Sequence, residues 1–197
     1  MRVVYSQGPL FVGSPAQAGL FFFPRGAPAA PRSLRRYALR SAAARKDHMP
    51  LYFAYGANMD VAAMAVRCPH SRPLGLGRLA RYRFAILETG YATVAPDARA
   101  QVHGLLYDLA VADVPALDRY EEIGRRLYRK VVQPVLRAPV GSARALVYIG
   151  TSTREGPAAP GYVENIVASA RALGLPAAYI AFLESHAPNA QQRMSRR

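Results

Sequence analysis

Two segments of the sequence combine residue types and spacings that could do chemistry. The first is a helix expected over residues 113–122, which carries the adjacent carboxylates Glu121 and Glu122. At about 100° per residue, Glu121 lies within about 60° of Val114 and Leu117 on the apolar face, while Glu122 turns toward water. Burial disfavours a charged carboxylate, so the pKa of Glu121 is expected to rise into the range useful for proton transfer. Glu121 is therefore a candidate acid or base, and a buried glutamate satisfied by an arginine is the structural alternative.

The second segment is the turn Tyr55-Gly-Ala-Asn58, which separates an expected strand from an expected helix. Glycine lets the backbone approach a ligand closely, and the N–H groups ahead of a helix point outward with the helix dipole behind them. Such a turn suits a carboxylate or a developing oxyanion. Taken alone, the same residues also describe an ordinary turn.

Both segments lie within an irregular succession of short strands and helices. Asp60 and Asp113 are expected to cap two helices, and Gly174 to end a third. The expected strands are 51–55, 81–86, 92–95, 101–109, 128–136 and 143–149, and the expected helices are 60–67, 113–122, 160–173 and 177–185. Strict βαβ repetition is absent, so the sequence predicts an α+β fold built on a small, closed or half-closed mixed β-barrel flanked by helices.

The net charge of +14 is concentrated at the two ends of the chain. Residues 1–48 have a net charge of +7 and residues 193–197 of +3, which leaves +4 between them. A nucleic-acid-binding domain would instead carry a basic face on its folded part. We therefore expect one domain over residues 49–188, a basic tail at 189–197 and no nucleic-acid partner. A nucleic-acid binder driven by the basic ends is the alternative, and it predicts salt-sensitive binding that is lost when the ends are removed.

Residues 1–48 are rich in Ala, Pro, Arg and Ser and show no clean periodicity. This composition is typical of a disordered basic leader, and it also resembles an organellar transit peptide. A third interpretation places the translation start at Met49 and makes the leader an upstream extension of the reading frame. We prefer it because the organised pattern begins directly after Met49. No apolar run reaches the roughly 18 residues that a membrane span needs, so no membrane partner is expected.

The cysteine and histidine content argues against a disulfide or a metal centre. Cys68 is the single cysteine, so no internal disulfide can form, and a reducing compartment, the cytoplasm, is expected. Cys68 lacks the cationic or glycine-rich setting that lowers a thiol pKa, which favours a packed structural thiol over a nucleophile. His70, His103 and His186 are scattered without metal-ligand spacing. We expect neither a metal ion nor a cofactor, and the sequence does not choose between a monomer and a homodimer.

Several segments together resemble the γ-glutamylcyclotransferase family in their order and spacing. They are Tyr52-Phe-Ala-Tyr-Gly-Ala-Asn-Met59, Gly90-Tyr-Ala-Thr-Val94, His103-Gly-Leu-Leu-Tyr-Asp-Leu109, Leu117-Asp-Arg-Tyr-Glu121 and the single residue Tyr128. Ala159-Pro-Gly-Tyr162 and Leu173-Gly-Leu-Pro-Ala-Ala-Tyr179 are similar to a later helical region of the glutathione-pathway enzymes in that family. The resemblance covers about residues 51–189 and none of the leader.

The resemblance implies an enzyme that cyclises a γ-glutamyl group of a small molecule, releases 5-oxoproline and uses no cofactor. The glutamate of the family's Leu-Asp-x-x-Glu segment is the catalytic acid/base, a role that falls here on Glu121. The helix-face argument selects the same residue independently. The substrate-binding roles implied by the resemblance fall on Tyr52, Tyr55, Gly56, Ala57, Asn58, Tyr128 and Tyr162.

Two residues depart from the family's pattern. Ala57 replaces the usual serine, which removes a hydroxyl donor and leaves the backbone N–H. Glu122 stands where the family usually has glycine, with Gly124 two positions later, so the exit of the helix and the leaving-group pocket are expected to differ. Two alternatives stay open: a relative that acts on γ-glutamylamines or on a γ-glutamyl biosynthetic intermediate, and a non-catalytic binding or interaction module on the same fold.

Overall fold

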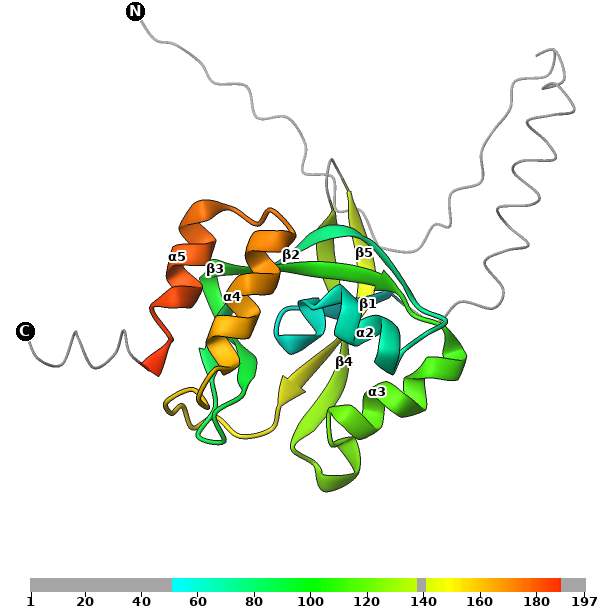
Figure 1. Cartoon of the computed structure of the whole chain (residues 1–197), viewed down its shortest axis with the longest axis horizontal. Helices are drawn as coiled ribbons and strands as arrows, with labels where there is room; N and C mark the ends of the chain where they lie inside the picture. Colours follow the sequence, from blue (N-terminus) through cyan, green and yellow to red (C-terminus); the bar gives the residue numbers. More distant parts are fainter. Residues whose placement is uncertain (1–50, 138–140, 189–197) are drawn as a thin grey trace, which may run out of the picture. The chain divides into compact units, whose positions relative to one another are not determined.

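Five strands close into a β-barrel in the computed structural model, which describes residues 51–137 and 141–188 (Figure 1). The strands are β1 (Leu51–Ala54), β2 (Arg72–Ile86), β3 (Ala92–Asp108), β4 (Tyr128–Arg137) and β5 (Ser142–Gly150). Their order around the barrel is β1-β3-β2-β4-β5, and the parallel pairing of β1 with β5 closes it. The other strand pairs are antiparallel, so the predicted mixed barrel is confirmed. The expected leader at 1–48 and basic tail at 189–197 lie outside the described residues.

The hairpin of β2 and β3 is longer than the sequence predicts. We expected β2 to begin at Arg81, but it begins at Arg72, and β3 runs without a break where two strands were expected. The ladder shifts register at Arg81, where the partners jump from Gln101 to Pro96. Arg81 has a left-handed backbone with φ of 65°. Such a bulge bends a strand and increases its twist, which helps a small sheet to close.

In the described residues, two helices and three short 3₁₀ turns connect the strands, and two further helices follow β5. The helices are α2 (Val61–Arg67), α3 (Val114–Tyr120), α4 (Tyr162–Ala172) and α5 (Ala177–Glu184), and the turns are η1 (Ala57–Met59), η2 (Val111–Asp113) and η3 (Ile123–Arg125). In Figure 1, α4 and α5 lie beside each other at the left of the barrel, and α3 lies at its lower right. Asp60 caps α2 as predicted, since its carboxylate accepts from Ala62 N at 2.9 Å and Ala63 N at 3.0 Å.

Helix α4 follows its predicted pattern closely. Its buried residues, Val163, Ile166, Val167 and Ala170, recur at helical spacing and pack toward the barrel. The helix ends before Gly174, whose φ of 68° is the left-handed conformation that commonly terminates a helix. None of the helices in the described residues has the length and apolar character needed to cross a membrane.

Candidate active site

A cavity of about 370 Å³ opens where β1, the η1 turn, the end of α3 and the start of α4 meet. Seven tyrosines contribute to its walls: Tyr52, Tyr55, Tyr91, Tyr120, Tyr128, Tyr148 and Tyr162. Every residue predicted for the site lines this cavity: Glu121, Tyr52, Tyr55, Gly56, Ala57, Asn58, Tyr128 and Tyr162. The structure thus brings together residues that are up to 110 positions apart in the chain, while their roles stay predictions.

Glu121 lies at the C-terminal end of α3 and faces the cavity. Its backbone N–H donates to Leu117 O at 2.9 Å, so it continues the helical geometry by one residue beyond Tyr120. Its Oε1 accepts a hydrogen bond of 2.8 Å from Asn58 Nδ2. Burial raises the pKa of Glu121 to about 7, against the opposing effects of the positive charge of Arg67 and of hydrogen bonds from Tyr52 and Asn58. A carboxyl group with such a pKa can both accept and return a proton near neutral pH.

Asn58 is the polar centre of the η1 turn and is itself buried. Its Nδ2 donates to Tyr52 OH at 2.8 Å as well as to Glu121. Its backbone carbonyl accepts from Tyr107 OH at 3.1 Å, which ties the turn to β3. Asn58 therefore joins β1, β3 and the end of α3, and the position of Glu121 depends on it.

The η1 turn is a single 3₁₀ turn in which Met59 N donates to Gly56 O at 3.0 Å. The first N–H groups of such a turn have no acceptor within it, so they remain available to a ligand or a neighbouring group. A Cβ atom added at Gly56 would lie 3.2 Å from the Tyr162 hydroxyl oxygen. A side chain at this position would therefore crowd the cavity wall, whereas the methyl group of Ala57 is accommodated.

The wall tyrosines differ in the use of their hydroxyl groups. Tyr55 OH donates to Tyr148 O at 2.5 Å, and Tyr128 OH donates to Ala92 O at 2.8 Å. Tyr162 OH instead accepts from Ala92 N at 3.2 Å, so its own proton is not used in that bond. Burial raises the pKa of all three phenols, which keeps them protonated at neutral pH. Tyr55 and Tyr128 thus shape the wall, and Tyr162 can donate into the cavity.

Glu122 follows the end of α3 with a left-handed backbone, φ 50° and ψ 41°. The helix therefore ends at Tyr120, two residues earlier than expected. The carboxylate of Glu122 pairs with Arg125 at 3.0 Å, and 39% of its side chain is exposed at the edge of the cavity. The left-handed backbone explains why a glycine would suit this position.

Sequence reasoning did not point to Arg67, Tyr120 or Tyr148. Arg67 contacts Asn58 and the ring of Tyr120, and Tyr148 lies on the cavity wall with its hydroxyl donating to Asp118 Oδ1 at 2.6 Å. Tyr148 reaches the site from the distant strand β5, whereas Arg67 lies nine residues after Asn58 and Tyr120 directly precedes Glu121. The one local signal is the proximity of Asp118 to Glu121 on the same helix, one turn apart.

Asp113 does not cap α3 with its side chain, contrary to the expectation. Its carboxylate turns to the segment after α2, where it accepts from His70 N at 2.9 Å, His70 Nδ1 at 2.9 Å and Ser71 Oγ at 2.7 Å. Three hydrogen bonds from this short segment stabilise the Asp113 carboxylate more than a single capping bond at the start of α3 would. This network also satisfies His70, and residues 51–137 and 141–188 contain no group of His, Cys, Asp or Glu side chains arranged to hold a metal ion.

Cys68 is fully buried, as expected for a structural thiol. Burial raises its thiol pKa to about 11. A thiol that stays protonated at neutral pH is a poor nucleophile. Cys68 therefore belongs to the core and not to the site.

Comparison with known proteins agrees with this fold. Residues 101–183 match the model of the AIG2-like family. Among solved structures, a protein described as gamma-glutamyl cyclotransferase is 22% identical, with a TM-score of 0.66 over 70% of this chain and 88% of that chain. An uncharacterized protein from Homo sapiens is 23% identical, with a TM-score of 0.66 over 71% of this chain and 88% of that one. YkqA from Bacillus subtilis is 20% identical, with a TM-score of 0.61, and covers 77% of this chain and 58% of its own.

No curated protein sequence is significantly similar to the chain. The fold is nevertheless the α+β barrel of gamma-glutamyl cyclotransferase-like proteins. The resemblance of this chain to the γ-glutamylcyclotransferase-like family is confirmed by the AIG2-like match and by the likeness to the solved structure described as gamma-glutamyl cyclotransferase.

Proposed function

We propose that this protein is a γ-glutamylcyclotransferase that converts the γ-glutamyl group of a small molecule into 5-oxoproline. The observation that supports this most strongly is Glu121, a carboxyl group with a pKa of about 7 held by Asn58 inside a tyrosine-walled cavity. The cavity volume of about 370 Å³ is that of a small-molecule site. The likeness of the fold to a gamma-glutamyl cyclotransferase adds support.

The reaction needs no second reactant, because the nucleophile and the electrophile belong to one substrate molecule. The ionised Glu121 takes a proton from the substrate's α-ammonium group, and the freed nitrogen attacks the γ-carbonyl carbon. Confinement in the cavity favours the folded substrate in which these two atoms meet. A carbon–nitrogen bond of the five-membered lactam forms in this step.

Collapse of the tetrahedral intermediate then breaks the bond between the γ-carbon and the leaving nitrogen. Glu121 gives its proton to the leaving nitrogen, which departs as an amine. The attacking nitrogen loses its second proton to Glu121 as the lactam forms, and this proton passes to the released amine or to solvent. The carboxylate is regenerated, so one glutamate carries all of these proton transfers.

The η1 turn supplies the proposed binding site for the γ-glutamyl group. Backbone N–H groups at Gly56 and Ala57 would receive the α-carboxylate or the tetrahedral oxygen, since Ala57 has no hydroxyl to contribute. Tyr162, whose hydroxyl lies beside this turn, would add a hydroxyl donor. Tyr52, Tyr55 and Tyr128 would exclude water and shape the pocket around the glutamyl chain.

A 5-oxoproline release assay over a panel of γ-glutamyl amino acids, γ-glutamylamines and γ-glutamyl intermediates tests this proposal. Glu121→Gln should lose at least about a thousandfold in turnover, because it removes the single proton carrier. Glu164→Gln, on the exposed face of α4, is the matched control and should keep the wild-type rate. Glu122→Gln decides between the neighbouring carboxylates, and loss of turnover in Glu122→Gln alone would contradict the assignment.

The same panel separates the two alternatives. A preference for amine leaving groups over amino acids would identify a γ-glutamylamine enzyme. Binding of γ-glutamyl compounds without release of 5-oxoproline from any of them would identify a binding module on the same fold.

A further inference from the structure

Arg67 is the last residue of α2 and contacts the candidate site without lining the cavity. It is half-buried, and its guanidinium carbon lies 3.4 Å from the centroid of the Tyr120 ring. One of its nitrogens, Nη1, donates a hydrogen bond to Asn58 Oδ1. Stacking on Tyr120 holds the planar guanidinium in one orientation, so the bond to Asn58 is pre-organised.

This contact determines which way the amide of Asn58 faces. Arginine has only hydrogen-bond donors, so the carbonyl oxygen of Asn58 must face Arg67. The amide nitrogen must then face the other way, toward Tyr52 OH at 2.8 Å and Glu121 Oε1 at 2.8 Å. With the amide reversed, an oxygen would face the carboxylate of Glu121 and repel it.

The hydrogen bonds between α2 and Glu121 are therefore all donated in one direction, from Arg67 toward Glu121. Arg67 donates to Asn58, and Asn58 donates to both Tyr52 and Glu121. Because the Tyr52 oxygen accepts from Asn58, its own proton can be given to Glu121, and this hydrogen bond favours the ionised carboxylate. Each of these hydrogen bonds favours the ionised Glu121, which can accept the substrate's proton at the start of the reaction.

Charged and titratable groups surround Glu121 on several elements. Arg67 provides the positive charge that opposes the rise in the pKa of Glu121, and Asp118, on the same helix, adds to that rise. Phenol groups near Glu121 come from β1, from the residue that follows it, and from β4, β5, α3 and α4; they belong to Tyr52, Tyr55, Tyr128, Tyr148, Tyr120 and Tyr162. Burial raises the pKa of each phenol, so Arg67 supplies the positive charge among these groups at neutral pH.

We propose that Arg67 is a positioning residue for the acid/base at Glu121 and acts through the side-chain amide of Asn58. This inference rests on the proposed function for its kinetic consequences, but its structural consequence can be measured without any substrate. Arg67 fixes the direction of the Asn58 amide and thereby keeps Glu121 ready to accept a proton.

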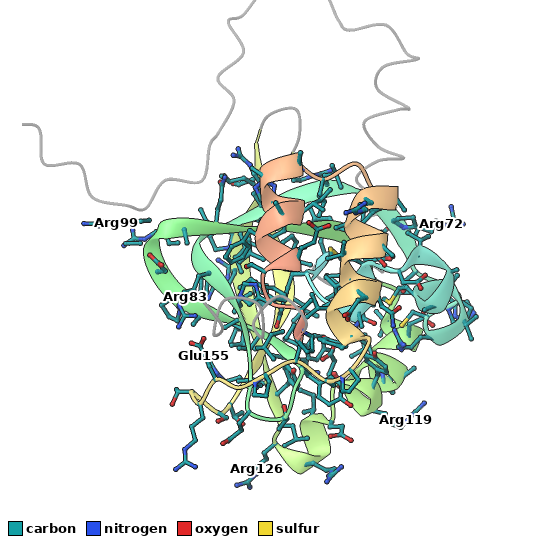
Figure 2. The ribbon with its side chains drawn as sticks, turned by 60° about the vertical axis from the view of Figure 1, so that its left-hand side comes forward. Arg72, Arg83, Arg99, Arg119, Arg126 and Glu155 are labelled. Atoms are coloured by element: carbon teal, nitrogen blue, oxygen red, sulfur yellow. The ribbon has the colours of Figure 1, made fainter. Side chains whose placement is uncertain are left out.

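The kinetic test replaces Arg67 by methionine, whose chain can still pack on Tyr120. Arg67→Met should lower kcat for 5-oxoproline release about tenfold and change KM less than about threefold, because the substrate-binding wall is unchanged. Arg67→Lys keeps the charge and a donor without the planar fork, so its kcat should lie between those of the wild type and Arg67→Met. If Arg67→Met does not fold, Arg67→Lys tests the role of Arg67 in its place. Arg119→Met, on the outward face of α3 (Figure 2), is the matched control and should leave kcat unchanged.

A double-mutant cycle tests whether Arg67 acts through Asn58. In an Asn58→Ala background, Arg67→Met should lower kcat by less than about twofold, because the relay is already broken. The same tenfold loss in both backgrounds would overturn the proposal.

The second readout is the pKa of Glu121, followed by carboxyl-carbon NMR titration of the free protein. Arg67→Met should raise this pKa above that of the wild type, and Arg119→Met should leave it unchanged. An equal Glu121 pKa in wild type and Arg67→Met would overturn the proposal. If no γ-glutamyl compound releases 5-oxoproline, the proposed function fails, but the titration still decides the role of Arg67.

Discussion

The two ends of helix α3 each carry a carboxylate turned away from open solvent, and their environments differ sharply. At the N-terminal end, Asp113 accepts three hydrogen bonds from His70 and Ser71. Burial raises the pKa of Asp113, but the hydrogen bonds outweigh burial and the net effect lowers it. At the C-terminal end, burial dominates, and the pKa of Glu121 rises to about 7.

The difference shows that burial alone does not define a proton carrier. Asp113 has the less exposed side chain of the two, yet its donors keep it ionised and tie it to the segment after α2. Glu121 has fewer donors and a cavity beside it. A carboxylate whose ionisation is disfavoured and which lies beside a cavity is suited to proton transfer. A carboxylate whose oxygens already accept several hydrogen bonds is suited to stabilising the fold.

The largest effect on stability is expected at the N-terminal end. Asp113→Ala leaves the His70 N–H and the Ser71 hydroxyl without their partner and should lower the free energy of unfolding by about 3 kcal/mol. Denaturant unfolding at pH 7 measures the loss, and Asp113→Asn, which keeps one acceptor oxygen, should lose less. Turnover of the folded fraction should be unchanged, and a selective loss of activity would place Asp113 in the chemistry.

Glu121, at the C-terminal end of α3, should instead destabilise the folded protein when it is charged. Between the ordinary glutamate pKa of 4.5 and about 7, the folded state holds the Glu121 proton more tightly than the unfolded state. Stability is therefore lost as the pH rises through this window. Glu121→Gln removes the loss and should be about 2 kcal/mol more stable than the wild type at pH 8, after allowance for partial exposure.

Denaturant unfolding of wild type and Glu121→Gln at pH 4 and pH 8 measures this difference. The two proteins should have similar stability at pH 4, and Glu164→Gln provides the control for loss of one charge. A destabilised Glu121→Gln at pH 8 would mean that the carboxylate is stabilised when charged, as Asp113 is.

A smaller effect is expected at Glu122, just beyond the same end of α3. Its left-handed backbone costs about 1 kcal/mol for a residue with a Cβ atom. Glu122→Gly should raise the melting temperature by relieving this strain, because the exposed pair with Arg125 contributes little. Glu122→Ala removes the same ion pair but keeps the Cβ, so a gain in Glu122→Ala equal to that in Glu122→Gly would exclude strain as the cause.

Much of the barrel could be predicted from local pattern. Alternating or clustered apolar residues marked most strands, and helical spacing placed Glu121 on the inner face of its helix. The pattern failed where pairing, not burial, defines the structure: residues 72–80 are largely exposed and are held by the ladder to β3. The side-chain direction of Asp113 was also missed, because its donors lie 42 and 43 positions earlier in the chain.

The candidate site was predictable only in part for the same reason. The turn at Gly56 and the glutamate at 121 have recognisable local settings. Tyr148 has none, since it reaches the site from the distant strand β5. Arg67 is only nine residues from Asn58, but no residue pattern marks the contact between them. The resemblance to a known family covered the first group of residues and offered no signal for the second.

The pH dependence of kcat/KM for 5-oxoproline release tests the central claim most directly. A Glu121 that must be ionised to accept the substrate's proton predicts an acidic limb with an apparent pKa of about 7, and this limb should be absent from the residual activity of Glu121→Gln. A profile that shows no change through pH 7, or a Glu121→Gln variant with the wild-type profile, would contradict the assignment of Glu121 as the proton carrier.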